Sequence, residues 1–318
     1  DRELTAGSLW PVSHSIKIAH VEVIVDSEGN FLKNRARQLG WQESATVIPT
    51  TESSAGRTSG IAPHPLCEEL SYIASDLPAQ KNGQIQEYLR ALGEFCCVPR
   101  PAESANSLRQ LATITNQFVT WFGASESAKK APKIVDLENA IRKLSQSASL
   151  PSHLSKLPAF FVESNLTFAK KNTQYFGQLE SWCDSEFANK KAIAVLAYLR
   201  RGCLWMDLNN EKIFPVSTTS RSGQKTKVDD GKVFVRWRVE NIGDPCTAVW
   251  EDQKLIDDWV AFDQKNNGKT GFCMVTGRNV RLAQNHPRFL RNSSDGAKVV
   301  SANDFDGYTF KGRFTDVK

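Results

Sequence analysis

The 318-residue sequence lacks the short motifs by which catalytic sites are usually recognised. It has no GxxxxGK[ST] phosphate loop, no HExxH zinc motif, no GxSxG nucleophile turn and no GxGxxG after a predicted strand. The five histidines are scattered, and none has a Cys or His partner at the spacing of metal ligands. Dispersed carboxylates can still converge in space, so an enzyme is not excluded. The sequence gives no positive support for an enzyme, a metal site or a cofactor.

Cysteine pairs and long apolar runs are also missing. The seven cysteines form no CxxC pair and no regular framework, a usage typical of reduced thiols in the cytosol. The sequence shows neither a signal peptide nor an apolar run of eighteen residues. We therefore predict a cytoplasmic protein with no membrane partner. Because the chain begins at Asp1 and ends without an obvious cap, we expect it to be a piece of a longer protein.

Positive charge is present in a small excess that is unevenly distributed. Lys and Arg number 40 against 35 Asp and Glu, a net charge of +5. Residues 212–238 carry a local excess of +5 (seven basic, two acidic), and residues 271–318 carry +4 (eight basic, four acidic). An anionic partner such as nucleic acid would meet these two segments. A solvated basic surface without such a partner is the alternative.

The hydrophobic pattern predicts an α+β fold. Residues 16–25 alternate and lead into turn residues at 27–30, which indicates a β-hairpin, and residues 46–49 indicate a short strand. Apolar residues at helical spacing predict helices over residues 66–74, 85–96, 104–122, 135–144, 166–181, 190–200 and 250–267. Residues 145–158 break the pattern and are predicted to form a linker.

Residues 232–240 predict a strand with two different faces. Trp237 lies on the apolar face, and Arg236 and Arg238 lie on the charged face. We predict three regions: a β-containing N-terminal part (1–100), a mainly helical part (101–210) and a basic α/β part (211–318).

Residues 50–72 combine small hydroxyl side chains, two glycines and one arginine. Gly56 and Gly60 permit positive φ or close approach of another molecule. Arg57, beside Thr58, Ser59 and Gly60, adds a fork of donors suited to phosphate oxygens or to the acceptor-rich minor groove of DNA. We therefore interpret this segment as a contact loop. A polar surface turn is the alternative.

Residues 285–298 have a similar composition. Three basic residues surround small polar ones, and the candidate ligands are Arg288, Arg291, Asn292, Ser293, Ser294 and Lys298. Phosphate contacts by such residues give an affinity that falls steeply with salt.

Four stretches of the chain resemble the large subunit of the type I-C CRISPR surveillance complex, Cascade (the Csd-type family). They are DSEGNFL at 26–32, SAGRTSGIAPHPLCEELSYI at 54–73, CMVTG at 273–277 and HPRFLRNSSDGAKVVSANDFDGY at 286–308. The chain departs from the family pattern at His64-Pro65, where many relatives have Asn-Phe, and at Asn292-Ser293, where they have Gly or Gln. Relatives continue into a helical C-terminal region, which we expect to be absent here.

The resemblance implies a non-catalytic role in antiviral defence. Such a subunit binds the double-stranded DNA target, recognises the protospacer-adjacent motif (PAM), starts strand separation in the R-loop and helps recruit the helicase–nuclease. Its other partners are the CRISPR RNA and the remaining Cascade subunits. In this RNA-guided division of labour, RNA pairing reads the protospacer and the protein reads the short motif.

The resemblance also implies roles for the candidate residues. Those expected to contact the motif duplex are Arg57, Thr58, Ser59, Gly60 and His64. A polar wedge at the fork is predicted from Gln80, Lys81, Asn82 and Gln84. The residues of the 285–298 segment, Arg288, Arg291, Asn292, Ser293, Ser294 and Lys298, are expected on the DNA backbone or the displaced strand.

Two other functions remain open at this point. One is a structural scaffold that binds CRISPR RNA and other subunits without reading DNA. The other is a metal-dependent nuclease that uses scattered carboxylates such as Asp304, Asp306 and Asp316.

Overall fold

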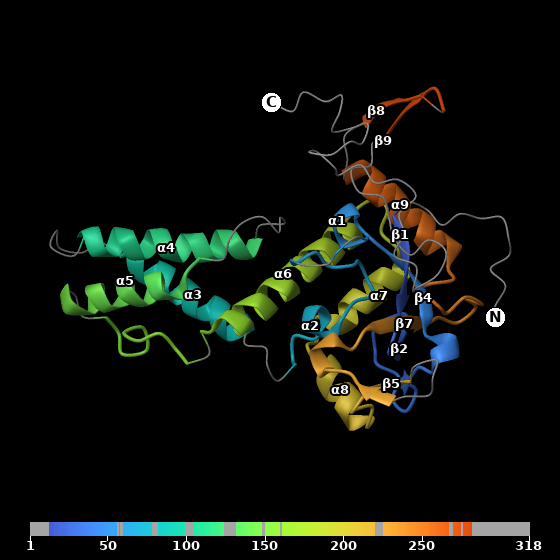
Figure 1. The fold of residues 1–318 in the computed structure, drawn as a ribbon, viewed down its shortest axis with the longest axis horizontal. Coiled ribbons are helices and arrows are strands. Elements are labelled where there is room, and N and C mark those ends of the chain that lie inside the picture. Colours follow the sequence, from blue (N-terminus) through green and yellow to red (C-terminus); the bar gives the residue numbers. More distant parts are fainter. Residues whose placement is uncertain are drawn as a thin grey trace.

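A computed structural model describes residues 13–55, 57, 60–77, 82–98, 105–123, 132–147, 150–159, 161–219, 225–266, 270–274 and 276–281. These residues fold into helices and small sheets, which confirms the α+β class. In Figure 1, α3 (Asn82–Cys97), α4 (Ala105–Gly123) and α5 (Ile134–Ser147) lie together on one side, and the sheets lie on the other.

Strand β2 (Val21–Asp26) lies at the centre of the main sheet. It pairs in parallel with β7 (Val235–Glu240) and antiparallel with the short β3 (Arg37–Gln38). Beside it, β1 (His14–Ile18) and β4 (Ala45–Pro49) form an antiparallel pair. A short 3₁₀ turn, η1 (Trp41–Glu43), precedes β4. The main sheet therefore joins strands that lie far apart in the sequence, β2 and β7.

The predicted hairpin is only partly correct. Residues 16–25 form two strands instead of one, because the chain leaves β4 at Ala19 and His20 and joins β7. The Ala19 amide donates to the Ser44 carbonyl, and the His20 amide donates to the Phe234 carbonyl. The turn after β2 is confirmed: Gly29 has a φ of +76°, and a Cβ there would lie 2.6 Å from the Ala194 carbonyl oxygen.

The sheet packs against helices in the larger of two hydrophobic cores (Figure 1). These helices are α2 (Leu70–Ile73), α7 (Lys190–Leu199), α8 (Leu204–Asn210), α9 (Gln253–Asn266) and the C-terminal half of α6 (Glu163–Cys183). Val235, Trp237 and Val239 of β7 face this core, which confirms the predicted apolar face. The helix predicted over 66–74 is shorter, because Leu66 adopts a φ of +68°.

A second core joins α3 (Asn82–Cys97), α4 (Ala105–Gly123) and α5 (Ile134–Ser147) to the first half of α6. Leu166 and Ala169 of α6 belong to this core, whereas Tyr175 and Trp182 belong to the larger one. Helix α6 therefore connects the two cores, as Figure 1 shows. The division at residues 100 and 210 stays a prediction. The second core comes from residues 85–169, and the larger core draws on residues on both sides of that segment.

The linker predicted over residues 145–158 is wrong. Helix α5 continues to Ser147, and Leu154 is only 3% exposed in the second core. The Tyr88 hydroxyl donates to the carbonyl of Lys156 at 3.3 Å. Apolar residues between the polar ones fix this segment to α3.

Two small ribbons and two short helical turns remain to be described. Strands β5 (Ser217–Thr219) and β6 (Lys225–Lys227) pair antiparallel, as do β8 (Thr270–Cys273) and β9 (Arg278–Arg281). A 3₁₀ turn, η3 (Asp230–Lys232), leads into β7, and α1 (Glu52–Ala55) follows β4. Within the described ranges, no helix is long and apolar enough to cross a membrane.

Candidate nucleic-acid interface

The contact loop predicted around Arg57 begins after α1 and is held by a buried ion pair. The Arg57 guanidinium donates to both oxygens of Glu68, from Nη1 to Oε2 at 2.8 Å and from Nη2 to Oε1 at 3.1 Å. Nη1 also donates to the Ala62 carbonyl at 2.7 Å. The side chain of Arg57 is 13% exposed and that of Glu68 is fully buried. Arg57 therefore binds its own loop tightly.

Glu68 fixes more of the loop than its pair with Arg57. Its carboxylate accepts from the backbone amides of His64 at 2.7 Å and Glu69 at 2.9 Å. Burial alone raises the pKa of the Glu68 carboxyl, but the charge of Arg57 and the hydrogen bonds from Arg57 and the His64 amide lower it below its usual value. Burial would likewise lower the pKa of Arg57, and the facing carboxylate raises it instead. The pair is therefore fully charged at neutral pH.

The ring of Tyr72 contacts two cationic side chains. Arg57 and Lys171 each lie 4.7 Å from the centre of its ring. Lys171 also donates to the Ser71 hydroxyl at 3.1 Å, and burial lowers the pKa of its ammonium group. Cation–π contacts of this kind add rigidity beneath the loop, because they order the two cations against one ring.

His64 does not present its ring to a partner in this structure. The ring is fully buried and lies 6.3 Å from that of Phe234. Neither ring nitrogen has a hydrogen-bond partner among the described residues. Burial lowers the pKa of His64 to about 3, and nearby Glu68 only partly opposes this. The ring is therefore neutral at physiological pH, and contact between it and DNA would require the segment to rearrange.

Of the remaining motif-contact candidates, Gly60 is exposed with a φ of +79°. Thr58 and Ser59 lie outside the described residues, as do Gln80 and Lys81 of the predicted wedge. Asn82 begins α3, and Gln84 is exposed on the first turn of that helix. The candidates on the backbone or displaced strand also lie outside the described residues: Arg288, Arg291, Asn292, Ser293, Ser294 and Lys298.

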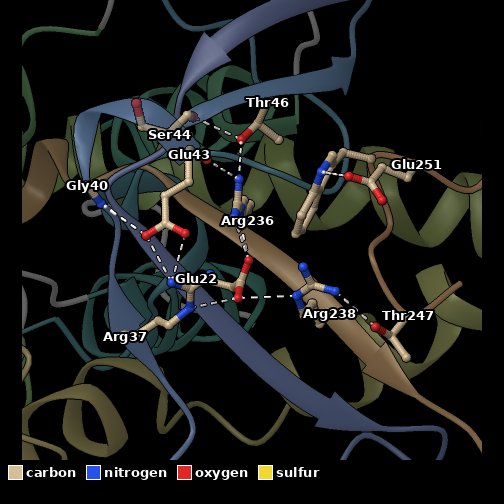
Figure 2. Close-up of polar contacts among 11 residues, drawn as sticks. Glu22, Arg37, Gly40, Glu43, Ser44, Thr46, Arg236, Arg238, Thr247 and Glu251 are labelled. Carbon is tan, nitrogen blue, oxygen red and sulfur yellow. Dashed lines mark hydrogen bonds and ion pairs between the residues drawn. The ribbon is translucent and has the colours of Figure 1, made fainter. Parts of the chain in front are cut away.

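A second cluster of charges lies on the face of the sheet predicted to be charged (Figure 2). Glu22, 1% exposed, is paired in register with Arg236 across β2 and β7. Its carboxylate contacts Arg236 at 2.6 Å, Arg37 at 3.1 Å and Arg238 at 3.2 Å. Burial would raise the pKa of Glu22, but the arginines hold it low.

This cluster is largely occupied by its own contacts. Arg236 also donates to the Glu43 carbonyl at 2.7 Å and lies 3.9 Å from the ring centre of Trp250. Arg238 donates to the Thr247 hydroxyl at 3.0 Å, as Figure 2 shows. Arg236 is only 3% exposed. Arg236 and Arg238 belong to the basic segment expected to meet an anionic partner. Their contacts instead help to hold β2, β3, β7 and η1 together.

Sequence reasoning found Arg57 and Arg236 but missed the carboxylates that hold them. A signal was present in both cases. Glu68 follows an apolar stretch, HPLC, and Glu22 interrupts a run of strand residues. A carboxylate at a position expected to be buried needs a cationic partner, and the nearest arginines could have been assigned to that task.

The described residues contain no group of three His, Cys, Asp or Glu side chains that could hold a metal ion. Asp304, Asp306 and Asp316 of the nuclease alternative lie outside them. The geometry is that of a loop held by its own buried ion pair on an α+β body.

A family model described as CRISPR-associated protein (Cas_Csd1) matches residues 1–146 and 159–317. Because the match covers nearly the whole chain, the chain belongs to this CRISPR-associated family, the type I-C large subunit. This confirms the resemblance carried by the four stretches. Other Cascade subunits are the partners that membership indicates. No curated protein matches the chain.

Proposed function

We propose that this chain is the DNA-binding large subunit of a type I-C surveillance complex. It recognises the protospacer-adjacent motif in duplex DNA, promotes strand separation and helps recruit the helicase–nuclease, without catalysis of its own. Family membership is the observation that supports this role most strongly. CRISPR RNA and target DNA are then its nucleic-acid partners.

In this proposal, the loop at residues 57–64 contacts the motif duplex. Thr58, Ser59 and Gly60 supply hydroxyls and a closely approaching backbone. The Arg57–Glu68 pair supports a rigid loop, which limits the entropy lost on binding. Arg57 and His64 mainly support the loop from inside the protein, because their side chains are buried.

The other two groups of candidate residues act in strand separation and in binding of the DNA backbone or the displaced strand. Gln84, exposed at the start of α3, belongs to the wedge with Gln80, Lys81 and Asn82. Arg288, Arg291, Asn292, Ser293, Ser294 and Lys298 bind the DNA backbone or the displaced strand. Loss of these backbone contacts weakens binding to all duplexes about equally.

The test compares assembled complexes on duplexes with and without the motif. The double variant Thr58→Val/Ser59→Ala removes the hydroxyls and leaves the Arg57–Glu68 pair intact. We expect motif discrimination to fall about tenfold, because good readout of one base edge is worth roughly 1–3 kcal/mol in all. Arg57→Ala should lower discrimination as well, through loss of loop geometry.

Gly60→Ala has a matched control in Gly243→Ala. Both glycines have positive φ, +79° and +85°, and both substitutions strain the backbone. Only the variant at Gly60 should lower discrimination. Unchanged affinity and discrimination in the double variant, in Gly60→Ala and in Arg57→Ala would sink the assignment of this loop. Failure of Arg57→Ala complexes to assemble, with DNA binding intact in the others, would favour the scaffold alternative.

A further inference from the structure

The β8–β9 ribbon exposes apolar side chains that neither core uses. Phe272 is 62% exposed, Met274 is 88% exposed and Val280 is 37% exposed. Among the described elements, the main contacts of each strand are with the other strand, and neither strand contributes to a hydrophobic core. Figure 1 shows the ribbon beyond one end of α9, away from β2 and β7. Since the ribbon contributes to neither core of the described residues, these apolar side chains are available to a partner.

The charge of the chain segment around the ribbon indicates which kind of partner it binds. Residues 264–294 contain no Asp or Glu, and their basic residues are Lys265, Lys269, Arg278, Arg281, Arg288 and Arg291. Arg278 is exposed on β9. A basic segment that also exposes an aromatic ring is complementary to nucleic acid, which offers both phosphates and bases.

The register of the ribbon places an aromatic ring and a side-chain amide on the same face. Phe272 is paired with Asn279, so both side chains lie on one face of the ribbon. Arg278 is paired with Cys273 on the other face. The exposed ring of Phe272 therefore lies opposite the exposed amide of Asn279, and Arg278 is the next residue along β9, with its side chain on the other face.

We propose that the β8–β9 ribbon binds an unpaired nucleic-acid strand, with one base stacked on Phe272. Asn279 donates to or accepts from the edge of that base, and Arg278 neutralises a phosphate. Exposed aromatic rings on strands bind single-stranded nucleic acid in this way, with little dependence on sequence. The inference rests on the proposed function, because the opened DNA and the CRISPR RNA are the two sources of unpaired nucleotides.

The first test is the affinity of assembled complexes for motif-bearing DNA. Phe272→Ala should weaken binding or slow strand opening by about tenfold, the typical effect of a lost base–aromatic stack. Phe272→Trp should retain near-normal binding, since it keeps a stacking surface. Ile242→Ala is the control, because Ile242 is also an exposed apolar residue (102%) but lies outside the ribbon. Arg278→Gln should reduce the salt dependence by about one phosphate contact.

Photocrosslinking identifies the source of the strand. Complexes carry 4-thiothymidine in the displaced DNA strand or 4-thiouridine in the CRISPR RNA. Trypsin cleaves after Lys269 and Arg278 and releases β8, with Phe272, in the peptide 270–278. Crosslinking of this peptide to either strand, lost in Phe272→Ala, supports the proposal. Normal binding by Phe272→Ala, or crosslinks of the ribbon to protein subunits alone, would overturn it.

The two proposals fail in different ways. If wild-type complexes do not discriminate the motif, the proposed function fails, whereas the RNA crosslink still tests the ribbon. If Phe272→Ala leaves both affinity and crosslinks unchanged while motif discrimination is present in the wild type, only the ribbon inference fails. Phe272→Ala should leave the ratio of motif-bearing to motif-free affinity unchanged.

Discussion

The loop at residues 57–69 and the β8–β9 ribbon both combine an arginine with an aromatic residue, but they use them differently. In the loop, Arg57 is 13% exposed, pairs with Glu68 and covers the ring of Tyr72. On the ribbon, Arg278 and Phe272 are both exposed. The Glu22 cluster resembles the loop, because Arg236 pairs with a carboxylate and covers Trp250. A nearby buried carboxylate thus distinguishes an arginine that stabilises the fold from one that is free to meet a ligand.

The largest expected effect is on the Glu22 cluster. Glu22→Ala leaves the buried Arg236 without its carboxylate, and removal of one partner of a buried pair costs about 3–5 kcal/mol. Urea denaturation of the purified chain measures the loss. The control is Glu43→Ala, since Glu43 is 44% exposed and its pair with Arg37 contributes about 1 kcal/mol or less. Equal losses in the two variants would contradict a distinct role for burial.

Arg57→Ala should destabilise the chain somewhat less, by about 3 kcal/mol, because it leaves Glu68 buried and unpaired. The double variant Arg57→Ala/Glu68→Ala should recover part of this loss, because it removes both charges. Denaturation of the two single variants and the double variant gives the coupling free energy. Additive losses would show that the two side chains do not stabilise the loop as a pair.

The buried imidazoles predict a loss of stability in mild acid. Burial lowers the pKa of His14 to about 4 and that of His64 to about 3. The unfolded chain takes up protons on these rings below about pH 6.5, while the folded chain does not until the lower values are reached. The stability is therefore fully present above about pH 6.5 and falls as the pH drops towards 4 and 3.

Between pH 7 and pH 5, each of these two rings should account for about 2 kcal/mol of that fall. His14→Leu and His64→Leu should flatten the pH dependence of the unfolding free energy, measured by denaturation at both pH values. His153→Leu is the control, because His153 is exposed. A pH dependence that is identical in wild type and both buried-site variants would show that the rings are not held neutral.

The smallest effect is expected on the ribbon. Phe272→Ala and Arg278→Ala should each change the free energy of unfolding by less than about 0.5 kcal/mol, because both side chains are exposed. Thermal or urea denaturation measures this. A large destabilisation would mean that the ribbon packs into the body and that its arginine resembles Arg57 after all.

Much of the fold followed from local patterns. The helices predicted over 85–96, 104–122, 135–144, 166–181, 190–200 and 250–267 all form within a few residues of these limits, because each has an apolar face at helical spacing. Strand β7 has the predicted apolar and charged faces. The parallel pairing of β2 with β7 was not predicted, since it joins residues more than 200 positions apart and no local pattern encodes such a contact.

The candidate site was predictable in composition but not in geometry. Arg57 and the glycine-rich loop were found from residue type alone. Arg57 and His64 are buried by Glu68, Tyr72 and Phe234. Glu68 and Tyr72 follow the turn at Leu66, and Phe234 directly precedes β7. Residue type alone does not specify whether a donor side chain is exposed, because that depends on which residues pack against it in the fold.

Photocrosslinking from the DNA motif tests the central claim most directly. Complexes are assembled on duplexes that carry 4-thiothymidine within the motif, and trypsin releases the loop as residues 58–81. The account predicts that this peptide is crosslinked to motif-bearing DNA and that the ribbon peptide, residues 270–278, is not. Crosslinks from the motif to other peptides or other subunits, with none to residues 58–81, would contradict it.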